Sequence, residues 1–247
     1  MRQQSLLVKL WVVALILAFS VTGCLGTREW TYPPPPDKMF LGIKADQPVS
    51  GSLVVLPLVD QRGKEVKEEY WKVAIPLVPS GTTFYDRPED VKDPEQIDQV
   101  QFNPAEDFAR ALADEIREAK IFSSVAYAGK SAAPTSEYVL QGRLHSTRWE
   151  RSITTYLLGP LGTVFWMIGL PMGQTDIGVE MDLRLTASAD PSKVLWSFSM
   201  EYKGWDLDGI YYGLANEVNS YPTALQEALR PAVTDLANKA ASSLSPS

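Results

Sequence analysis

Apolar and polar residues alternate strictly in two consecutive stretches in the second half of the chain. From Ile177 to Ala187 every second residue is apolar, and polar or charged residues fill most of the positions between them. The alternation resumes from Val194 to Tyr202, after an expected turn over 190–193. A period of two is typical of strands that bury one face, so these stretches predict an antiparallel hairpin with its other face in water.

Three further stretches have the pattern of strands. Residues 52–59 form a nearly continuous apolar run, which is typical of a strand buried on both faces. Residues 137–150 alternate, with Tyr138 and Leu144 among the inward positions, and a short strand is expected over 124–128. The sheet should therefore combine buried and half-buried strands.

Two stretches repeat their apolar residues with the period of a helix. Before the first, Asn103 can cap the N-terminus and Pro104 suits the first helical position. The second covers 222–244, where Pro231 is expected to kink the helix. The order of elements predicts an α+β fold (two-layer α/β): a mixed sheet with an antiparallel meander and two main helices packed on one face.

Residues 52–247 are expected to form a single periplasmic domain with insertions at 60–101 and 153–175. Prolines break the first insertion, where an edge strand is expected over 71–79. In the second, 156–173 carries no charged residue. Exposed apolar surface of this kind marks an interface, and a buried crossover under the sheet is the alternative that the sequence leaves open. The residues expected to make a protein interface or a membrane contact are Tyr156, Leu161, Phe165, Trp166, Met167, Ile168 and Leu170.

The N-terminus has the three parts of a signal peptide. Basic residues precede an apolar stretch, which ends in Val21-Thr22-Gly23-Cys24 with the only cysteine of the chain. This motif resembles the lipobox of bacterial lipoproteins, which implies removal of residues 1–23, cleavage between Gly23 and Cys24, and acylation of Cys24. A plain secretion signal or a membrane anchor is the alternative, although the apolar run of about 13 residues is shorter than the roughly 20 of a spanning helix.

The residues after the cysteine predict where the protein sits. In the lipoprotein families of enteric-type bacteria, Asp at this position holds the protein at the inner membrane. Leu25 therefore favours the outer membrane, on its periplasmic side. Residues 24–51 are expected to be a tether, because the four prolines after Tyr32 favour a semi-rigid polyproline II spacer.

Charge and cysteine content exclude several classes of protein. A formal net charge of −7 argues against nucleic-acid binding, which depends on Lys and Arg contacts to phosphates. With Cys24 consumed by lipid, no cysteine remains for a disulfide, a catalytic thiolate or a metal site. We expect no cofactor and no metal.

Candidate catalytic groups are few. His145 is the only histidine, and strand alternation places it with Arg143, Thr147 and Trp149 on a face expected to lie in water. The chain lacks a Gly-x-Ser-x-Gly elbow and the glycine-rich loops that bind nucleotides. We therefore expect that the protein is not an enzyme. A carboxylate-dependent envelope hydrolase is the less favoured alternative, with candidate residues Asp86, Glu89, Asp90, Asp93, Asp206 and Asp208.

Three segments of the body share features with a known group of domains: the apolar strand 53–60, the helix from Phe108 that ends before Ile121-Phe122-Ser123-Ser124-Val125, and the strand 138–144 with Gly142. This order resembles the curli-secretion-lipoprotein-like and translocation-protein N-terminal-like domains of bacterial envelope lipoproteins. The resemblance implies non-enzymatic work in secretion, assembly or regulation.

The expected partners follow from the anchor and from this resemblance. They are the membrane, through the N-terminal lipid, and an envelope protein or further copies of this chain. A periplasmic carrier of lipid or of a small ligand is the alternative.

Overall fold

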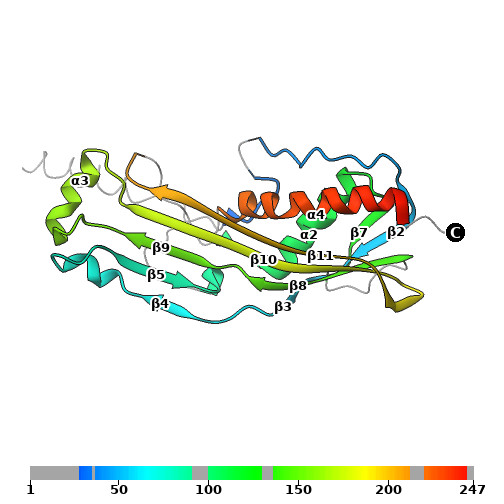
Figure 1. The fold of residues 1–247 in the computed structure, drawn as a ribbon, viewed down its shortest axis with the longest axis horizontal. Helices are drawn as coiled ribbons and strands as arrows, with labels where there is room; N and C mark the ends of the chain where they lie inside the picture. Colours follow the sequence, from blue (N-terminus) through cyan, green and yellow to red (C-terminus); the bar gives the residue numbers. More distant parts are fainter. Residues whose placement is uncertain (1–27, 35–36, 91–99, 130–135, 212–219, 244–247) are drawn as a thin grey trace, which may run out of the picture.

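The structure is a computed structural model that describes residues 28–34, 37–90, 100–129, 136–211 and 220–243. An open mixed sheet of nine strands forms the body, and two long helices pack on one of its faces (Figure 1). This arrangement confirms the predicted α+β fold. None of the helices in the described residues is long and apolar enough to cross a membrane.

Parallel and antiparallel strands occupy different parts of the sheet. Strand β2 lies between β7 and β8 and is parallel to both, whereas β4, β5, β9, β10 and β11 pair with their neighbours in the antiparallel sense. The bounds are β2 Val49–Val55, β3 Val59–Asp60, β4 Val66–Glu68, β5 Gly81–Tyr85, β7 Phe122–Tyr127, β8 Tyr138–Ser146, β9 Trp149–Ile153, β10 Gly173–Ala187 and β11 Asp190–Asp208.

Most strands lie where their sequence patterns predict them, although the apolar run 52–59 divides between β2 and β3 and its last residue, Val59, is 56% exposed. Leu53, Val54 and Val55 of β2 are all buried, as expected for a strand covered on both faces. Strands β10 and β11 form the predicted hairpin, paired from Gly173 with Asp208 to Ala187 with Asp190. The turn occupies residues 188–189, two residues before the predicted turn over 190–193, and Asp190 already belongs to β11.

The two helices bury the faces that their periodicity predicts. Helix α2 (Pro104–Glu118) packs on β2 and β7, and α4 (Tyr221–Ser243) packs on β10 and β11. Asn103 makes no side-chain cap; its own N–H donates to the carboxylate of Asp107 (2.8 Å). Helix α4 runs through Pro231 as a single helix.

A bulge in β8 corrects the predicted environment of the strand beyond His145. Leu144 and Ser146 pair with consecutive residues of β10, so His145 is an extra residue in the ladder. An extra residue shifts the alternation, and side chains after it change face. Thr147 and Trp149 are therefore fully buried, where alternation alone predicted a face in water.

The first insertion also differs from its prediction. Residues Tyr70–Ala74 form a short 3₁₀ helix, η1, rather than an edge strand. The strand that follows this helix is β5, which begins after Pro79 and pairs with β9. Prolines interrupt a ladder of backbone hydrogen bonds, and the segment between them therefore turns instead of pairing.

The described part of the predicted tether packs against the body instead of extending from it. We call residues 28–34 and 37–48 the strap. Its first residues, β1 (Arg28–Glu29), pair in parallel with β6 (Val100–Gln101). Trp30, Tyr32 and Leu41 then pack against the hydrophobic core. Apolar residues on both sides of Pro33 and Pro34 are partly buried, so the described part of this segment is not a free spacer.

Candidate functional site: an apolar tip

The uncharged segment between β9 and β10 forms a knob at one end of the long sheet, beyond the reach of α2 and α4 (Figure 1). It contains a 3₁₀ turn, η3 (Gly159–Gly162), and a short helix, α3 (Thr163–Met167). Helix η1 lies against it. We call residues 70–77 and 154–172 the apolar tip.

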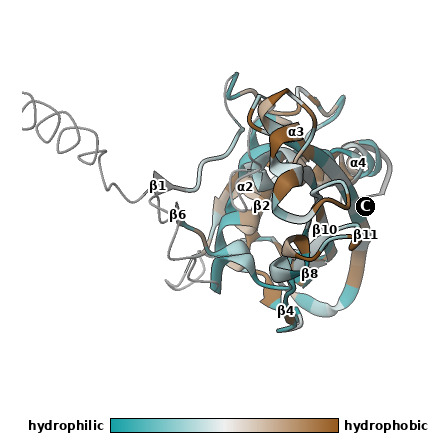
Figure 2. Cartoon of the chain, turned by 90° about the vertical axis from the view of Figure 1, so that its left-hand side faces the viewer, coloured by the Kyte–Doolittle hydropathy of each residue, from teal (hydrophilic) through white to brown (hydrophobic). Residues whose placement is uncertain are grey.

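Aliphatic side chains of the apolar tip face water. Leu161 is 74% exposed, Met167 67% and Ile168 70%, so a buried crossover does not describe them. Figure 2 looks onto this end of the molecule, where much of α3 is coloured as hydrophobic. The exposed apolar residues of the tip are Trp71, Ile75, Leu77, Leu157, Leu158, Leu161, Val164, Met167, Ile168 and Leu170.

Three aromatic residues, Tyr156, Phe165 and Trp166, have a different role in the tip from its exposed aliphatic residues. The Tyr156 hydroxyl donates to the carbonyl of Pro171 (2.6 Å), and its ring meets Phe165 edge-on with centroids 5.2 Å apart. The Trp166 indole N–H donates to the carbonyl of Thr154 (2.9 Å). These rings are half-buried and brace the tip from inside, whereas the other four predicted residues point outward.

Two leucines at the tip are held in strained backbone conformations. Leu77 and Leu157 both have φ of 68°, and the N–H of Leu77 donates to the carbonyl of Leu157 (2.8 Å). A residue with a side chain loses roughly 1–2 kcal/mol in this left-handed region. Such strain persists where the surrounding structure imposes it, and it clusters at binding sites. The tip therefore presents its leucines in a fixed arrangement.

Residues from elsewhere in the sequence extend this surface. Ile75 and Leu77 are exposed and come from the first insertion, where the sequence pattern predicted an edge strand. Ile210 and Tyr211 are also exposed, and the Tyr211 hydroxyl donates to the carbonyl of Met167 (2.9 Å). The run from Val73 to Pro79 carries no charge, like 156–173, and this was the signal that could have found it.

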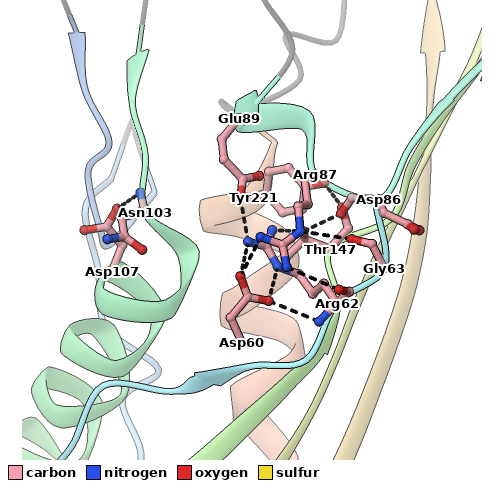
Figure 3. A network of polar contacts seen from close by, with 10 residues as sticks. All are labelled: Asp60, Arg62, Gly63, Asp86, Arg87, Glu89, Asn103, Asp107, Thr147 and Tyr221. Atoms are coloured by element: carbon pink, nitrogen blue, oxygen red, sulfur yellow. Dashed lines mark hydrogen bonds and ion pairs between the residues drawn. The ribbon is translucent and has the colours of Figure 1, made fainter. Parts of the chain in front are cut away.

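The buried Arg62, in the loop between β3 and β4, is the centre of a network of polar contacts (Figure 3). The guanidinium of Arg62 donates to both carboxylate oxygens of Asp60 (3.0 Å each), to Glu89 (2.5 Å) and to the hydroxyl of Thr147 (2.5 Å). Arg87 also pairs with Asp60 (3.0 Å). The hydrogen bonds from Arg62 lower the pKa of Asp60, and those to Asp60 and Glu89 raise the pKa of Arg62 against the opposing effect of its burial.

This network ties two carboxylates to one guanidinium, although the second carboxylate oxygen of Glu89 is buried without a hydrogen-bond partner among the described residues. Asp60 and Glu89 are brought together, but Arg62 contacts both. Thr147 links the network to the core, because its carbonyl accepts the hydroxyl of the buried Tyr221. The contacts satisfy the guanidinium that burial has removed from water.

Of the remaining catalytic candidates, Asp86 adjoins the Arg62 network, because its carbonyl accepts the Thr147 hydroxyl (3.0 Å; Figure 3), whereas Asp208 and His145 lie elsewhere in the sheet. Asp208 is fully buried and accepts hydrogen bonds from Arg151 (2.9 Å) and Thr175 (2.7 Å). Asp86 accepts the N–H of Glu65 (2.8 Å). On the open face of the sheet, His145 lies 2.8 Å from a carboxylate oxygen of Asp182. Asp90 and Asp206 are exposed, and Asp93 lies outside the described residues, as do Gly23 and Cys24.

The open face of the sheet carries a shallow depression of about 380 Å³ opposite the helices. Its lining mixes charged and apolar residues: Arg148 pairs with Glu150, Lys203 pairs with Glu201, and Ile177 and Val179 lie among them. The apolar side chains of the tip point into water instead of lining this depression. The carrier alternative needs an enclosed apolar site, and the tip does not form one.

Comparison with known proteins gives distant structural likenesses. No family model and no curated protein matches the sequence. A Xanthomonas campestris protein of family DUF330 aligns with TM-score 0.39 and 13% identity, over 86% of this chain and 92% of its own. A proposed lipoprotein from Caulobacter crescentus CB15 aligns with TM-score 0.32 and 15% identity, over 55% of this chain and 84% of its own. At these values, neither likeness determines the function of this chain, and the resemblance to curli-secretion domains stays a prediction from sequence.

Proposed function

We propose that this chain is a lipid-anchored envelope protein without enzymatic activity, which binds a protein partner through the apolar tip. The anchor is Cys24, in the outer membrane on its periplasmic side, as the lipobox and Leu25 predict. The partner is another envelope protein or a second copy of the chain. The observation that carries this proposal is the exposure of a braced, uncharged group of aliphatic side chains.

The energy available at the tip suits a protein interface. Full burial of one Leu, Ile or Met side chain is worth about 1.5–3 kcal/mol. Association costs an estimated 4–15 kcal/mol in lost freedom, so several such side chains must be buried together. The bracing by Tyr156 and Trp166 lowers the cost of ordering the tip on binding.

The rigid shape of the apolar tip favours a protein partner with a complementary pocket over a lipid surface. Hydrocarbon chains adapt to any apolar shape, so insertion into a bilayer does not require leucines that are held in a strained backbone conformation. Leu77 and Leu157 are held at positive φ, which is useful where the partner has a fixed shape. We therefore favour a protein partner over insertion into the bilayer.

Photo-crosslinking in intact cells tests the proposal. A photoreactive amino acid replaces Met167 in the full-length chain. The control places it at Val194, which is exposed and pairs with Thr186, at the end of β10 remote from α3. We expect a discrete protein adduct from position 167, absent from position 194 and lost when Ile168→Asp is added. Adducts with phospholipid alone, or none in a folded protein, would overturn the proposal.

A further inference from the structure

The strap changes what an anchor at Cys24 implies, because it is part of the folded body from residue 28 onward. The backbone of Arg28 and Glu29 pairs with β6, and the N–H of Trp30 donates to the carbonyl of Gln101 (3.3 Å). The Trp30 ring then lies 5.6 Å from Phe102 and 5.9 Å from Phe108, centroid to centroid. These contacts join the beginning of the strap to the beginning of α2.

A buried carboxylate holds the middle of the strap. Glu115 of α2 is 2% exposed, and it accepts the Tyr32 hydroxyl (2.5 Å) and the backbone N–H of Leu41 (3.0 Å). A charge-assisted hydrogen bond is about twice as strong as a neutral one. Two positions of the strap, nine residues apart in the sequence, are therefore tied to one side chain.

The end of the strap is also fixed before it enters the sheet. The N–H of Ala45 donates to the carbonyl of Ala119 (2.9 Å), and the N–H of Val49 donates to that of Ile121 (2.8 Å). Gln226 of α4 donates to the carbonyl of Met39 (2.6 Å). The strap thus lies over the helices, on the side away from the sheet (Figure 1).

Covalent geometry then limits how far the body can stand from an acylated Cys24. An extended chain spans at most about 3.3–3.6 Å per residue, so the four steps from Cys24 to Arg28 reach about 14 Å. A free tether through residue 51 would reach about 90 Å by the same rule. The polar layer on each side of a bilayer is about 5–8 Å thick.

We propose that the strap holds the body directly on the bilayer, with the strap and the start of α2 facing the lipid and the open polar face of the sheet facing away. This inference rests on acylation of Cys24, as proposed above. The occupant of this surface is the phospholipid bilayer that contains the anchor, because only three residues separate Cys24 from the fold. The body is then oriented by its strap rather than swinging on a long tether.

Fluorescence quenching in vesicles measures this orientation. The native Cys24 is acylated, so single cysteines introduced elsewhere can be labelled selectively. Gln101→Cys places the label on the exposed strand beside β1, and Ser197→Cys places it on the open face of the sheet. The full-length lipidated protein is reconstituted in phosphatidylethanolamine/phosphatidylglycerol vesicles with quencher-labelled headgroups. We expect strong quenching at 101 and weak quenching at 197.

An insertion separates tethering from orientation. A Gly/Ser segment of about twelve residues after Thr27 adds a mean reach of roughly 20 Å and should reduce the quenching at 101 toward that at 197. The same insertion between Ser188 and Ala189, in the hairpin turn, should leave it unchanged. Equal quenching at 101 and 197 without any insertion would overturn the orientation.

The mass of the N-terminal peptide distinguishes the two proposals. If Cys24 carries no lipid, the lipoprotein assignment itself fails. If Cys24 is acylated but position 101 is remote from the headgroups, the anchor stands and only the direct seating of the body is wrong.

Discussion

At the scale of single residues, buried charges set local stability in this protein. The side chain of Arg62 is 3% exposed and contacts Asp60 and Glu89. Removal of one member of a buried ion pair leaves an uncompensated charge, which typically costs about 3–5 kcal/mol. Exposed pairs contribute about 0–1 kcal/mol, because water screens them.

We expect Arg62→Met to lower the free energy of unfolding by about 3–5 kcal/mol in urea titrations. The matched control is Arg148→Met, which removes a half-exposed guanidinium that pairs with Glu150, and which should cost less than about 1 kcal/mol. Similar losses for the two variants would contradict a structural role for the Arg62 network.

Glu115 gives a prediction for pH. Its burial raises the pKa of its carboxyl above the ordinary value, although the hydrogen bonds from Tyr32 and Leu41 act in the opposite direction. Between the unfolded and the folded pKa, the folded protein binds this proton more tightly than the unfolded chain does. Its contribution to stability is therefore fully present below the unfolded pKa and is lost as the pH rises through the folded one.

The variant Glu115→Gln cannot titrate at this position. We expect the stability of the wild type relative to Glu115→Gln to be larger near pH 4 than near pH 7, measured by urea unfolding at each pH. A difference that stays constant, or grows toward pH 7, would show that burial does not dominate the environment of this carboxyl.

At the scale of elements, the tip shows how a turn can be built for contact rather than for its own stability. Leu157 keeps a side chain at a positive φ where glycine would be relaxed. Gly162 has the opposite constraint, because a Cβ there would lie 1.8 Å from the carbonyl oxygen of Thr155. Leu157 thus keeps its side chain in a strained conformation, whereas position 162 has no room for a side chain.

Leu157→Gly should leave the unfolding temperature unchanged or raise it, because relief of roughly 1–2 kcal/mol of backbone strain offsets the lost contacts of a half-exposed side chain. The same variant should weaken the protein adduct formed from position 167. Gly162→Ala should lower both stability and adduct, because it deforms the turn. Loss of stability in Leu157→Gly would mean that this leucine serves the fold.

The bulge at His145 is another feature of this scale. It lets β8 and β9 continue along β10 while Thr147 and Trp149 turn inward. Alternation in the sequence does not reveal an inserted residue, since each side of the bulge alternates correctly by itself. The predicted position of the strand was therefore correct, but the predicted faces of the side chains after His145 were wrong.

At the scale of the whole molecule, the strap joins the anchor region to the helical layer. Trp30, Tyr32, Leu41 and Ile43 pack on the core, and Glu115 depends on the strap for its hydrogen-bond donors. A spacer could be removed without effect on the body, whereas a packed strap could not.

A soluble chain that begins at Pro48 should accordingly be less stable than one that begins at Arg28. We expect a loss of at least about 3 kcal/mol, because several apolar side chains leave the core and a buried carboxylate loses its partners. Chemical denaturation of the two chains makes the comparison. Equal midpoints would restore the interpretation of this segment as a tether.

The amino-acid sequence by itself determined the local elements: the hairpin of β10 and β11, the buried apolar end of β2, and the two amphipathic helices, because each has a clear hydrophobic pattern of its own. It also located the uncharged segment 156–173. Only the tertiary structure decided that the aliphatic residues of this segment face water while Tyr156, Phe165 and Trp166 brace it.

The strap and the Arg62 network also depended on tertiary contacts. Tyr32 and Leu41 bind Glu115, and Arg62 binds Glu89 and Thr147, across 27–85 residues of sequence. Periodicity reports which side of an element is apolar. It carries no information on which distant segment will cover that side, and this choice is made only when the whole core is assembled.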